Sequence, residues 1–159
     1  MGCGLAGWLA VKAYKQPVSV LVVIHTPDLR VLLLERADHP GYWQSVTGSR
    51  NPGETPEQTA IREVREETGI EADECVLTDW NLSNTYEIYP QWRHRYAPGV
   101  SHNTEHVFGL RVPHPVPVTL SAREHLRYVW VPREEAMKMV FSPSNAEAIE
   151  KLDKIAGKP

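Results

Sequence analysis

The sequence contains little cysteine. Cys3 and Cys75 are the two cysteines among 159 residues, and neither forms a CxxC pair or stands near a histidine at the spacing of a zinc ligand set. This pattern argues against a disulfide framework and against a zinc site, and it is typical of a protein of the reducing cytoplasm.

Long apolar runs are also missing. No run approaches the roughly 20 residues that span a bilayer, and the stretch MGCGLAGWLAV lacks the basic segment of a signal peptide. Ala6 stands where a myristoylation signal has serine or threonine. We therefore expect no signal peptide and no membrane partner. We interpret residues 1–13 as an N-terminal extension that need not be ordered, followed by one domain over residues 14–159.

Positive charge does not exceed negative charge. The chain has 17 lysines and arginines against 20 aspartates and glutamates, so no overall basic field attracts nucleic acid. Arg93, His94 and Arg95 stand between Trp92 and Tyr96, which resembles the mixture of basic and aromatic residues in nucleic-acid sites. Without a second basic patch we predict no nucleic-acid partner. A loop with Arg93 or Arg95 near an anionic substrate, and plain surface arginines, remain as alternatives.

The distribution of apolar residues predicts a mixed α+β domain. Short β-branched and aromatic runs indicate strands over residues 18–25, 30–36, 43–47, 75–80, 85–89, 105–112 and 127–131, the first two as a hairpin. Helices are expected over residues 56–68 and 133–140, and from 143 or 145 to 155 with Ser142 or Ser144 as the cap. These elements imply a mixed sheet covered by helices on its faces.

The mid-chain helix has sequence signals at both ends. Thr55 is a natural N-cap, Pro56 suits the first helical position, and Gln58 completes a capping box. Gly69 suits the C-terminal stop. At about 100° per residue, one side of this helix is apolar and is expected to be buried; it carries Ala60, Ile61, Val64 and Thr68.

Another side of the same helix is acidic. Glu63, Glu66 and Glu67 stand at i, i+3 and i+4, so three carboxylates point along the edge of the core. One interpretation is a solvated acidic face softened by Arg62 and Arg65. The other is a divalent cation that offsets the repulsion, and oxygen ligands without histidine or cysteine nearby suit Mg2+ or Mn2+. The spacing on the helix alone leaves both interpretations open.

The residues around this helix resemble a known motif. From Gly48 to Ile70 the chain matches the Nudix box, G-x5-E-x7-R-E-U-x-E-E-x-G-U with U aliphatic, at every fixed position. The resemblance implies a Nudix fold, which is an α/β/α sandwich with a mixed β-sheet between helices. It also implies a hydrolase that uses a divalent metal.

The resemblance further implies a role for each residue of the box. Glu63 and Glu67 match the main metal ligands, and Glu66 matches a residue that assists them or holds the site. The remaining positions are structural in this interpretation: Gly48 and Gly69 serve the turns at the two ends, and Glu54 and Arg62 brace the loop against the helix.

Such a site suits hydrolysis of a phosphoanhydride bond. Cations stabilise the charge on phosphate oxygens and acidify the attacking water, so water attacks phosphorus without a covalent enzyme intermediate. Nudix hydrolases often add an acidic residue from outside the box as a metal ligand or base. Glu124 and Glu105 are the candidates, and we favour Glu124 because it stands just before a predicted strand. His39, His102 and His125 are interpreted as structural.

Beyond the box, the chain resembles a bacterial subgroup of the family that converts dihydroneopterin triphosphate, a folate precursor, to the monophosphate and pyrophosphate. The stretches YKQPVSVLVVI, GYWQSVTGS, RHRYAPGV with NTE, and EHLRYVW carry this resemblance, whereas residues 70–91 depart from it. In that subgroup the substrate is bound by the residues that match Lys15, Arg36, Thr47, Tyr86, Glu87, Ile88, Tyr89 and Ser142.

The chemistry of these side chains fits a pterin triphosphate. Lys15 and Arg36 can pair with phosphate oxygens, and Tyr86 and Tyr89 can lie against a flat ring. Arg36 as the cap of a strand and core-facing tyrosines are the structural alternatives. A broad (deoxy)nucleoside triphosphate pyrophosphohydrolase and a non-catalytic ligand-binding module remain as alternative functions, and the oligomeric state is left open.

Overall fold

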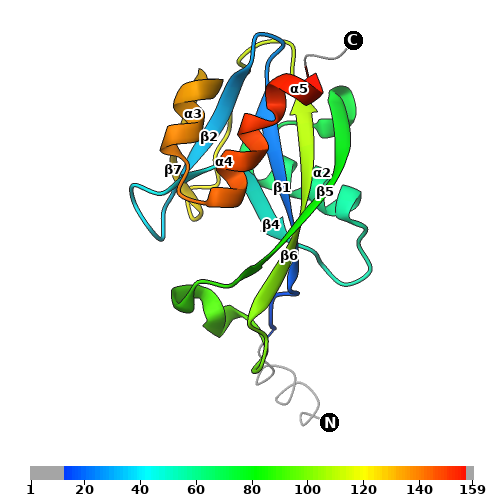
Figure 1. The fold of residues 1–159 in the computed structure, drawn as a ribbon, viewed down its shortest axis with the longest axis vertical. Coiled ribbons are helices and arrows are strands. Elements are labelled where there is room, and N and C mark those ends of the chain that lie inside the picture. Colours follow the sequence, from blue (N-terminus) through cyan, green and yellow to red (C-terminus); the bar gives the residue numbers. More distant parts are fainter. Residues whose placement is uncertain (1–12, 157–159) are drawn as a thin grey trace, which may run out of the picture.

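A mixed sheet packed between helices forms the body of the protein in the computed structural model, as predicted (Figure 1). The structure describes residues 13–156, so the predicted extension 1–13 lies outside it except for Ala13. No helix in this part of the chain is long and apolar enough to cross a membrane. In chain order the elements are β1 (Val18–His25), β2 (Arg30–Arg36), β3 (Trp43–Gln44), β4 (Val46–Ser49), α2 (Pro56–Thr68), η1 (Ala72–Glu74), β5 (Val76–Glu87), η2 (Pro90–Arg95), β6 (His102–Arg111), β7 (His125–Pro132), α3 (Arg133–Met139), α4 (Pro143–Glu150) and α5 (Leu152–Ala156).

Strand β1 lies in the middle of the sheet. Along one edge it pairs in parallel with β6 over its whole length, and β6 pairs antiparallel with β5. Along the other edge β1 pairs with β4, and it meets β2 only where His25 faces Val31. Strand β2 continues the sheet through β3 and β7. The two strands of the predicted hairpin therefore diverge directly after their turn, and β4 occupies the edge of β1 that β2 leaves.

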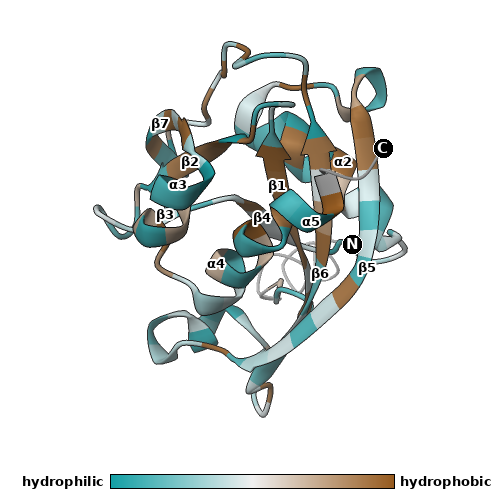
Figure 2. Ribbon diagram, turned by 45° about the horizontal axis from the view of Figure 1, so that its top comes forward, coloured by the Kyte–Doolittle hydropathy of each residue, from teal (hydrophilic) through white to brown (hydrophobic). Residues whose placement is uncertain are grey.

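Each face of the sheet carries an apolar core. Alternate residues of a strand point to opposite faces. Val20 and Val22 of β1 accordingly pack in the cluster that contains Ala60 and Val64 of α2. Leu21 and Val23 pack in a second cluster that contains residues of α3, α4 and α5, namely Ala136, Ala148, Ile149 and Leu152. Because both faces are covered, β1 is apolar along its length, whereas β5 at the sheet edge is largely hydrophilic (Figure 2).

The predicted strand over residues 43–47 is divided in two at Ser45, which corrects the prediction. The Ser45 N–H donates to Asn145 Oδ1 of α4 at 2.9 Å, and Asn145 Nδ2 donates to Ser45 Oγ at 2.9 Å. The side chain of Asn145 thus takes the place of a strand partner. As a result β3 ends at Gln44 and pairs with β2, while β4 begins at Val46 and pairs with β1.

The two strands predicted over residues 75–80 and 85–89 are a single strand, β5, which ends at Glu87. A bulge between Asp79 and Leu82 interrupts its pairing with β6. Asn81 has a φ of 53° there, and its N–H donates to Asp79 Oδ1 at 2.8 Å. Asparagine tolerates the left-handed backbone that such a bulge uses, so these polar residues bend the strand and do not end it.

Helix α2 begins and ends where its sequence predicts. The Gln58 N–H donates to Thr55 Oγ1 and the Thr55 N–H donates to Gln58 Oε1, which completes the capping box, and Gly69 ends the helix with a φ of 76°. The predicted apolar stripe faces the sheet, with Ile61 half-buried and Ala60, Val64 and Thr68 buried. Glu67 lies beside this stripe and is buried with it.

The last predicted helix is divided into two, α4 and α5. Ser142 is the cap of α4, and the alternative, Ser144, lies within its first turn. The Asn145 N–H donates to Ser142 Oγ at 3.4 Å. The same residue that divides β3 from β4 therefore also belongs to the first turn of α4, which fixes this helix on the sheet.

We predict that Asn145→Ala destabilises the fold by about 2–4 kcal/mol, because it leaves the buried N–H and hydroxyl of Ser45 without partners. Urea unfolding followed by circular dichroism measures the change. Asn51→Ala, at an exposed loop residue, is the control and should change the free energy of unfolding by less than about 0.5 kcal/mol. Equal stability of the two variants would contradict the role given to the Asn145 side chain.

Candidate active site

Two cavities meet beside strand β4. One, of about 490 Å³, is lined by Glu63, Glu67 and Glu124 and is called the acidic cavity. The other, of about 410 Å³, is lined by Tyr89 and Trp92, among other rings, and is called the aromatic cavity. A ligand with a charged end and a flat end can occupy both. The residues that line both cavities form the junction between them and include Lys15, Arg36, Gln44, Thr47, Gly48 and Arg95.

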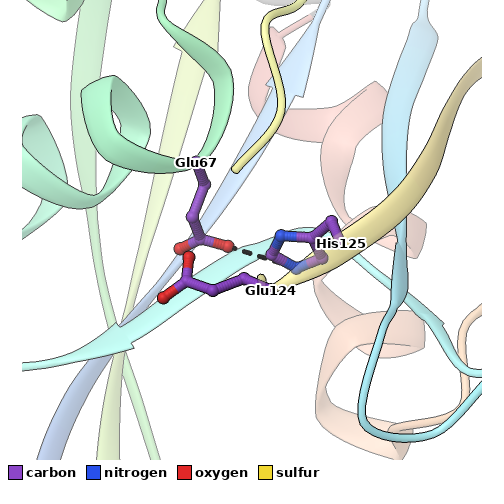
Figure 3. Close-up of side chains that lie close together, drawn as sticks. All are labelled: Glu67, Glu124 and His125. Carbon is purple, nitrogen blue, oxygen red and sulfur yellow. Dashed lines mark ion pairs between the residues drawn. The ribbon is translucent and has the colours of Figure 1, made fainter. Parts of the chain in front are cut away.

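Three side chains converge in the acidic cavity (Figure 3). Glu67 comes from the last turn of α2, Glu124 from the turn before β7, and His125 from the first residue of β7. One ligand atom from each of the three lies within 4.8 Å of the others. His125 Nε2 lies 3.5 Å from Glu67 Oε1, which is too far for a normal hydrogen bond. This is an arrangement in which the three groups can share a cation.

Glu67 is a buried acid without an N–H or hydroxyl donor. Its side chain is 2% exposed, and among residues 13–156 no N–H or hydroxyl group donates to either carboxyl oxygen; the Glu63 carboxyl group is the neighbour within hydrogen-bonding reach. Burial and the charge of Glu63 raise the pKa of Glu67, and burial also raises the pKa of Glu63. A buried carboxylate in this state costs several kcal/mol unless a positive charge neutralises it. Because carboxylate oxygens are preferred ligands of hard divalent cations, the two residues fit such an ion.

His125 is a candidate that the sequence interpretation missed. The sequence analysis interprets this histidine as structural, and the structure places a ring nitrogen of it within 4.8 Å of carboxylate oxygens of Glu67 and Glu124. Burial, followed by the charge of Arg36, lowers the pKa of His125 to about 4, so its ring is neutral at neutral pH. Neighbouring residues of a strand point to opposite sides. Here the N–H groups of both Glu124 and His125 donate to Ser121 O at 3.0 Å, and this turn brings both side chains into one cavity.

Arg62 ties the loop before α2 to the helix. Its Nε and Nη2 donate to Glu54 at 2.7 and 2.9 Å, and Nη2 also donates to Ser49 O at 2.9 Å. Its Nη1 donates to Glu63 at 2.7 Å and to Glu66 at 3.2 Å. The hydrogen bond from Arg62 lowers the pKa of Glu54 to about 2. Glu66 is 52% exposed and is absent from the lining of the acidic cavity, and its link to the site is its ion pair with Arg62.

Gly48 lies inside β4 and not at a turn, which corrects the role expected for it. A Cβ atom at this position would collide with the carboxyl group of Glu63, so the absence of a side chain is what matters. Gly69, by contrast, has the positive φ that the turn after α2 needs. Gly48 and Arg62 together determine where the Glu63 carboxyl group lies.

The walls of the aromatic cavity are built from rings. The Tyr89 and Trp92 rings stack with centroids 5.4 Å apart, and Phe141 meets both edge-on at 6.1 and 6.0 Å. Such walls hold a flat ring system by stacking and edge contacts. All eight residues that the resemblance assigns to the substrate line this cavity: Lys15, Arg36, Thr47, Tyr86, Glu87, Ile88, Tyr89 and Ser142.

Some of these eight side chains are already engaged within the protein. The Thr47 hydroxyl donates to Val20 O at 2.9 Å, and the Tyr86 hydroxyl accepts from Asn103 Nδ2 at 3.1 Å. Glu87 binds Arg93, whose side chain lines neither cavity, so Arg93 is not positioned to meet a phosphate. Thr47, Tyr86 and Glu87 therefore contribute to ligand binding mainly through the shape that they give the cavity wall.

The junction between the cavities is basic. Arg36 donates to both oxygens of Asp38 at 2.7 and 2.8 Å and to Gln44 Oε1 at 3.0 Å, and its Cζ lies 4.5 Å from the centroid of the Trp92 ring. A guanidinium has five N–H groups, so two remain for a ligand. Arg95 donates to Asp38 Oδ2 at 3.1 Å and lines both cavities. Arg36 and Arg95 are thus placed for an anionic group at the junction.

Comparison with known proteins agrees with this geometry. The dihydroneopterin triphosphate diphosphatase of Escherichia coli (strain K12) is 48% identical over 144 residues, which cover 89% of this chain and 95% of that enzyme. The enzyme of the same name from Haemophilus influenzae is 47% identical over 141 residues, which cover 87% and 88%. The structure of the E. coli dihydroneopterin triphosphate pyrophosphohydrolase superposes with a TM-score of 0.83 at 48% identity and covers 88% of this chain and 97% of that one.

A family model for the NUDIX domain covers residues 15–152. These residues include α2, the whole lining of the aromatic cavity and all of the acidic cavity except Ala13 and Tyr14. The spacing of the box, the carboxylates that it brings into the acidic cavity and the sandwich around them are all present in this segment. The chain therefore belongs to the Nudix family.

Proposed function

We propose that this protein hydrolyses dihydroneopterin triphosphate to dihydroneopterin monophosphate and pyrophosphate with a divalent cation, Mg2+ or Mn2+. The observation that carries the proposal is the junction of the two cavities: a buried acidic site opens directly into an aromatic one of suitable size for a flat ring. The similarity over almost the whole chain to two enzymes named for this substrate supports it. The reaction would belong to folate biosynthesis.

The acidic cavity would hold the cation. Glu67 and Glu124 would supply carboxylate oxygens and His125 a neutral ring nitrogen, and Glu63, which lines the same cavity, would add a further carboxylate. The buried oxygens of Glu67, which no N–H or hydroxyl group reaches, support this assignment. A bound divalent cation supplies charge neutralisation for the phosphate oxygens and acidifies the attacking water. Glu66 contributes by holding Arg62 in place.

The chain itself would orient the triphosphate. Lys15, Arg36 and Arg95 line the junction, so the phosphates lie there and extend toward the carboxylates. The pterin then lies among the rings of the aromatic cavity. Water attacks phosphorus and no covalent enzyme intermediate is needed, because the positioned positive charges stabilise the transition state without a nucleophilic side chain.

A small triphosphate is the only partner that this proposal requires. No nucleic-acid surface is needed, since Arg93 is bound to Glu87, and Arg36 and Arg95 line the junction where the triphosphate lies. We also propose a cytoplasmic location, because biosynthetic triphosphates are consumed there and Cys75 is a free cysteine.

The substrate is tested by turnover of dihydroneopterin triphosphate beside a panel of dNTPs and oxidised dNTPs, each at saturating Mg2+. We expect the pterin triphosphate to have the highest kcat/KM and to yield pyrophosphate as the leaving product. The aromatic rings and the junction provide the differential binding that such a preference needs. A clear preference for the nucleotide panel would replace this substrate with the alternative, a general nucleoside triphosphate pyrophosphohydrolase.

We predict that Glu67→Gln lowers kcat by about 10³-fold or more and preserves the fold, because a neutral amide cannot neutralise a cation yet keeps the shape of the side chain. Stability without metal should stay equal or rise, since a buried acid without partners is removed. Thermal unfolding with and without Mn2+ is the companion measurement: the wild type should gain stability from the ion and the variant much less. Normal turnover of the variant at modest Mg2+ would refute the metal role of Glu67.

We further predict that Gly48→Ala lowers kcat by roughly 10- to 100-fold, because the added methyl group displaces the Glu63 carboxyl group. The double variant Gly48→Ala with Glu63→Asp is the matched control, since the shorter acid leaves room for the methyl group. The two effects should then be strongly non-additive in a double-mutant cycle of kcat/KM. Additive losses would show that Gly48 acts through something other than the Glu63 side chain.

A further inference from the structure

Glu105 is a buried acid in the wall of the aromatic cavity. The residue is 4% exposed, and on β6 it lies next to Ser19 of β1 in the parallel ladder. Asn103, two residues earlier, is buried and lines the same cavity, because alternate residues of a strand face the same side. Glu105 is absent from the lining of the acidic cavity. Its position therefore does not suit a ligand of the cation, and its burial needs another explanation.

The Glu105 carboxyl group makes little use of its hydrogen-bonding capacity within the protein. Ser144 Oγ, from the first turn of α4, donates to Oε1 at 3.0 Å, which is the single hydrogen bond that this carboxyl group accepts among residues 13–156. Burial raises the pKa of Glu105 to about 7, against the opposing effect of Ser144. A carboxylate offers about four acceptor sites, so most of them remain for a ligand. A buried acid of this kind in a cavity is a candidate for ligand recognition.

We propose that Glu105 recognises the 2-amino-4-oxopyrimidine edge of the substrate ring. In a pterin this edge presents two adjacent donors, the ring N3–H and the exocyclic 2-amino group, and a carboxylate can accept both with its two oxygens. The inference rests on the function proposed above and adds the specificity-determining residue. Ser144 holds the carboxyl group and so acts as a positioning residue.

The orientation that contact with Glu105 gives the pterin ring agrees with the place proposed for the triphosphate. In a pterin the side chain that carries the triphosphate leaves from the end of the ring system opposite the pyrimidine edge. Glu105 lines only the aromatic cavity, whereas Lys15 and Arg36 lie at the junction. A ring that packs against the wall formed by Tyr89 and Phe141 can therefore place its donor edge on Glu105 and its triphosphate at the junction.

The contact with Glu105 favours bases that present two adjacent hydrogen-bond donors. Guanine presents the same pair of donors, so guanine nucleotides share the interaction. Adenine, cytosine and thymine each present an acceptor beside a single donor, and that acceptor would face a carboxylate oxygen. Such a mismatch leaves buried polar groups without partners, which is the strongest source of discrimination between similar ligands.

The first test measures binding of 7,8-dihydroneopterin, which has no phosphates, to metal-free protein by isothermal titration calorimetry. Glu105→Gln keeps the shape of the side chain but replaces an acceptor with a donor, and we expect it to raise the Kd roughly 10- to 100-fold. Glu150→Gln makes the same chemical change at an exposed residue of α4 and should leave the Kd within about twofold. Circular dichroism and the unfolding midpoint show whether each variant is folded.

The second test is the ratio of kcat/KM for dGTP to that for dATP. It should fall at least about tenfold in Glu105→Gln, whereas a merely structural role would lower both values together. Ser144→Ala should shift the same ratio less, since the carboxylate remains.

The outcomes separate this inference from the proposed function. Loss of dihydroneopterin binding in Glu105→Gln supports the inference even if the wild type fails to cleave the triphosphate, which would refute the proposed function alone. Equal binding by the wild type and Glu105→Gln, or no binding by the wild type, overturns the inference whatever the turnover. If Glu105→Gln does not fold, an unchanged dGTP to dATP ratio in Glu105→Asp, where the shortened acid withdraws from the ring edge, overturns it.

Discussion

Helix α2 must bury Ala60 and Val64 to close one face of the sheet, and the same rotation carries Glu67 into the protein. Glu63, one turn earlier, is held between Arg62 and the backbone of β4. A buried acid, Glu67, and a half-buried one, Glu63, thus stand in fixed positions, and protonation or a cation relieves their repulsion. Because the cost of assembling them is met by the packing of the helix, the carboxylates are preorganised for a cation before any ligand arrives.

The pairing of the strands determines which side chains line each cavity. Strand β1 pairs with β4 and meets β2 only at its end. The acidic cavity on the α2 side of the sheet and the aromatic cavity on the α4 side therefore connect beside β4. Glu63 and Glu67 reach the acidic cavity from α2 and Glu124 reaches it from the turn before β7, whereas β6, α4 and η2 contribute to the lining of the aromatic cavity. A ligand that spans the junction is therefore held by charge at one end and by ring packing at the other, and these two contributions are physically separable.

Features with a local cause were predictable from the sequence. The ends of α2 depend on Thr55, Gln58 and Gly69, which lie within a few residues of the groups that they cap, and the observed ends are the predicted ones. The bounds of β1 and β2 follow from continuous apolar runs. The spacing of Glu63 and Glu67 placed them on one side of a helix, and the motif around them distinguished a metal site from a solvated face. The substrate residues came from resemblance, and the structure groups them in one cavity.

Features that depend on distant contacts were decided by the tertiary structure. Ser45 interrupts a strand because it bonds to Asn145, 100 residues later in the chain. His125 joins Glu67 only through the turn at Ser121, and Gly48 is needed only because Glu63 lies over it. The sequence by itself determined which residue types stand on each helix and strand and where α2 begins and ends. Which side chains face one another was determined by packing, because a hydrogen bond or a cavity wall depends on the separation of groups in space and not along the chain.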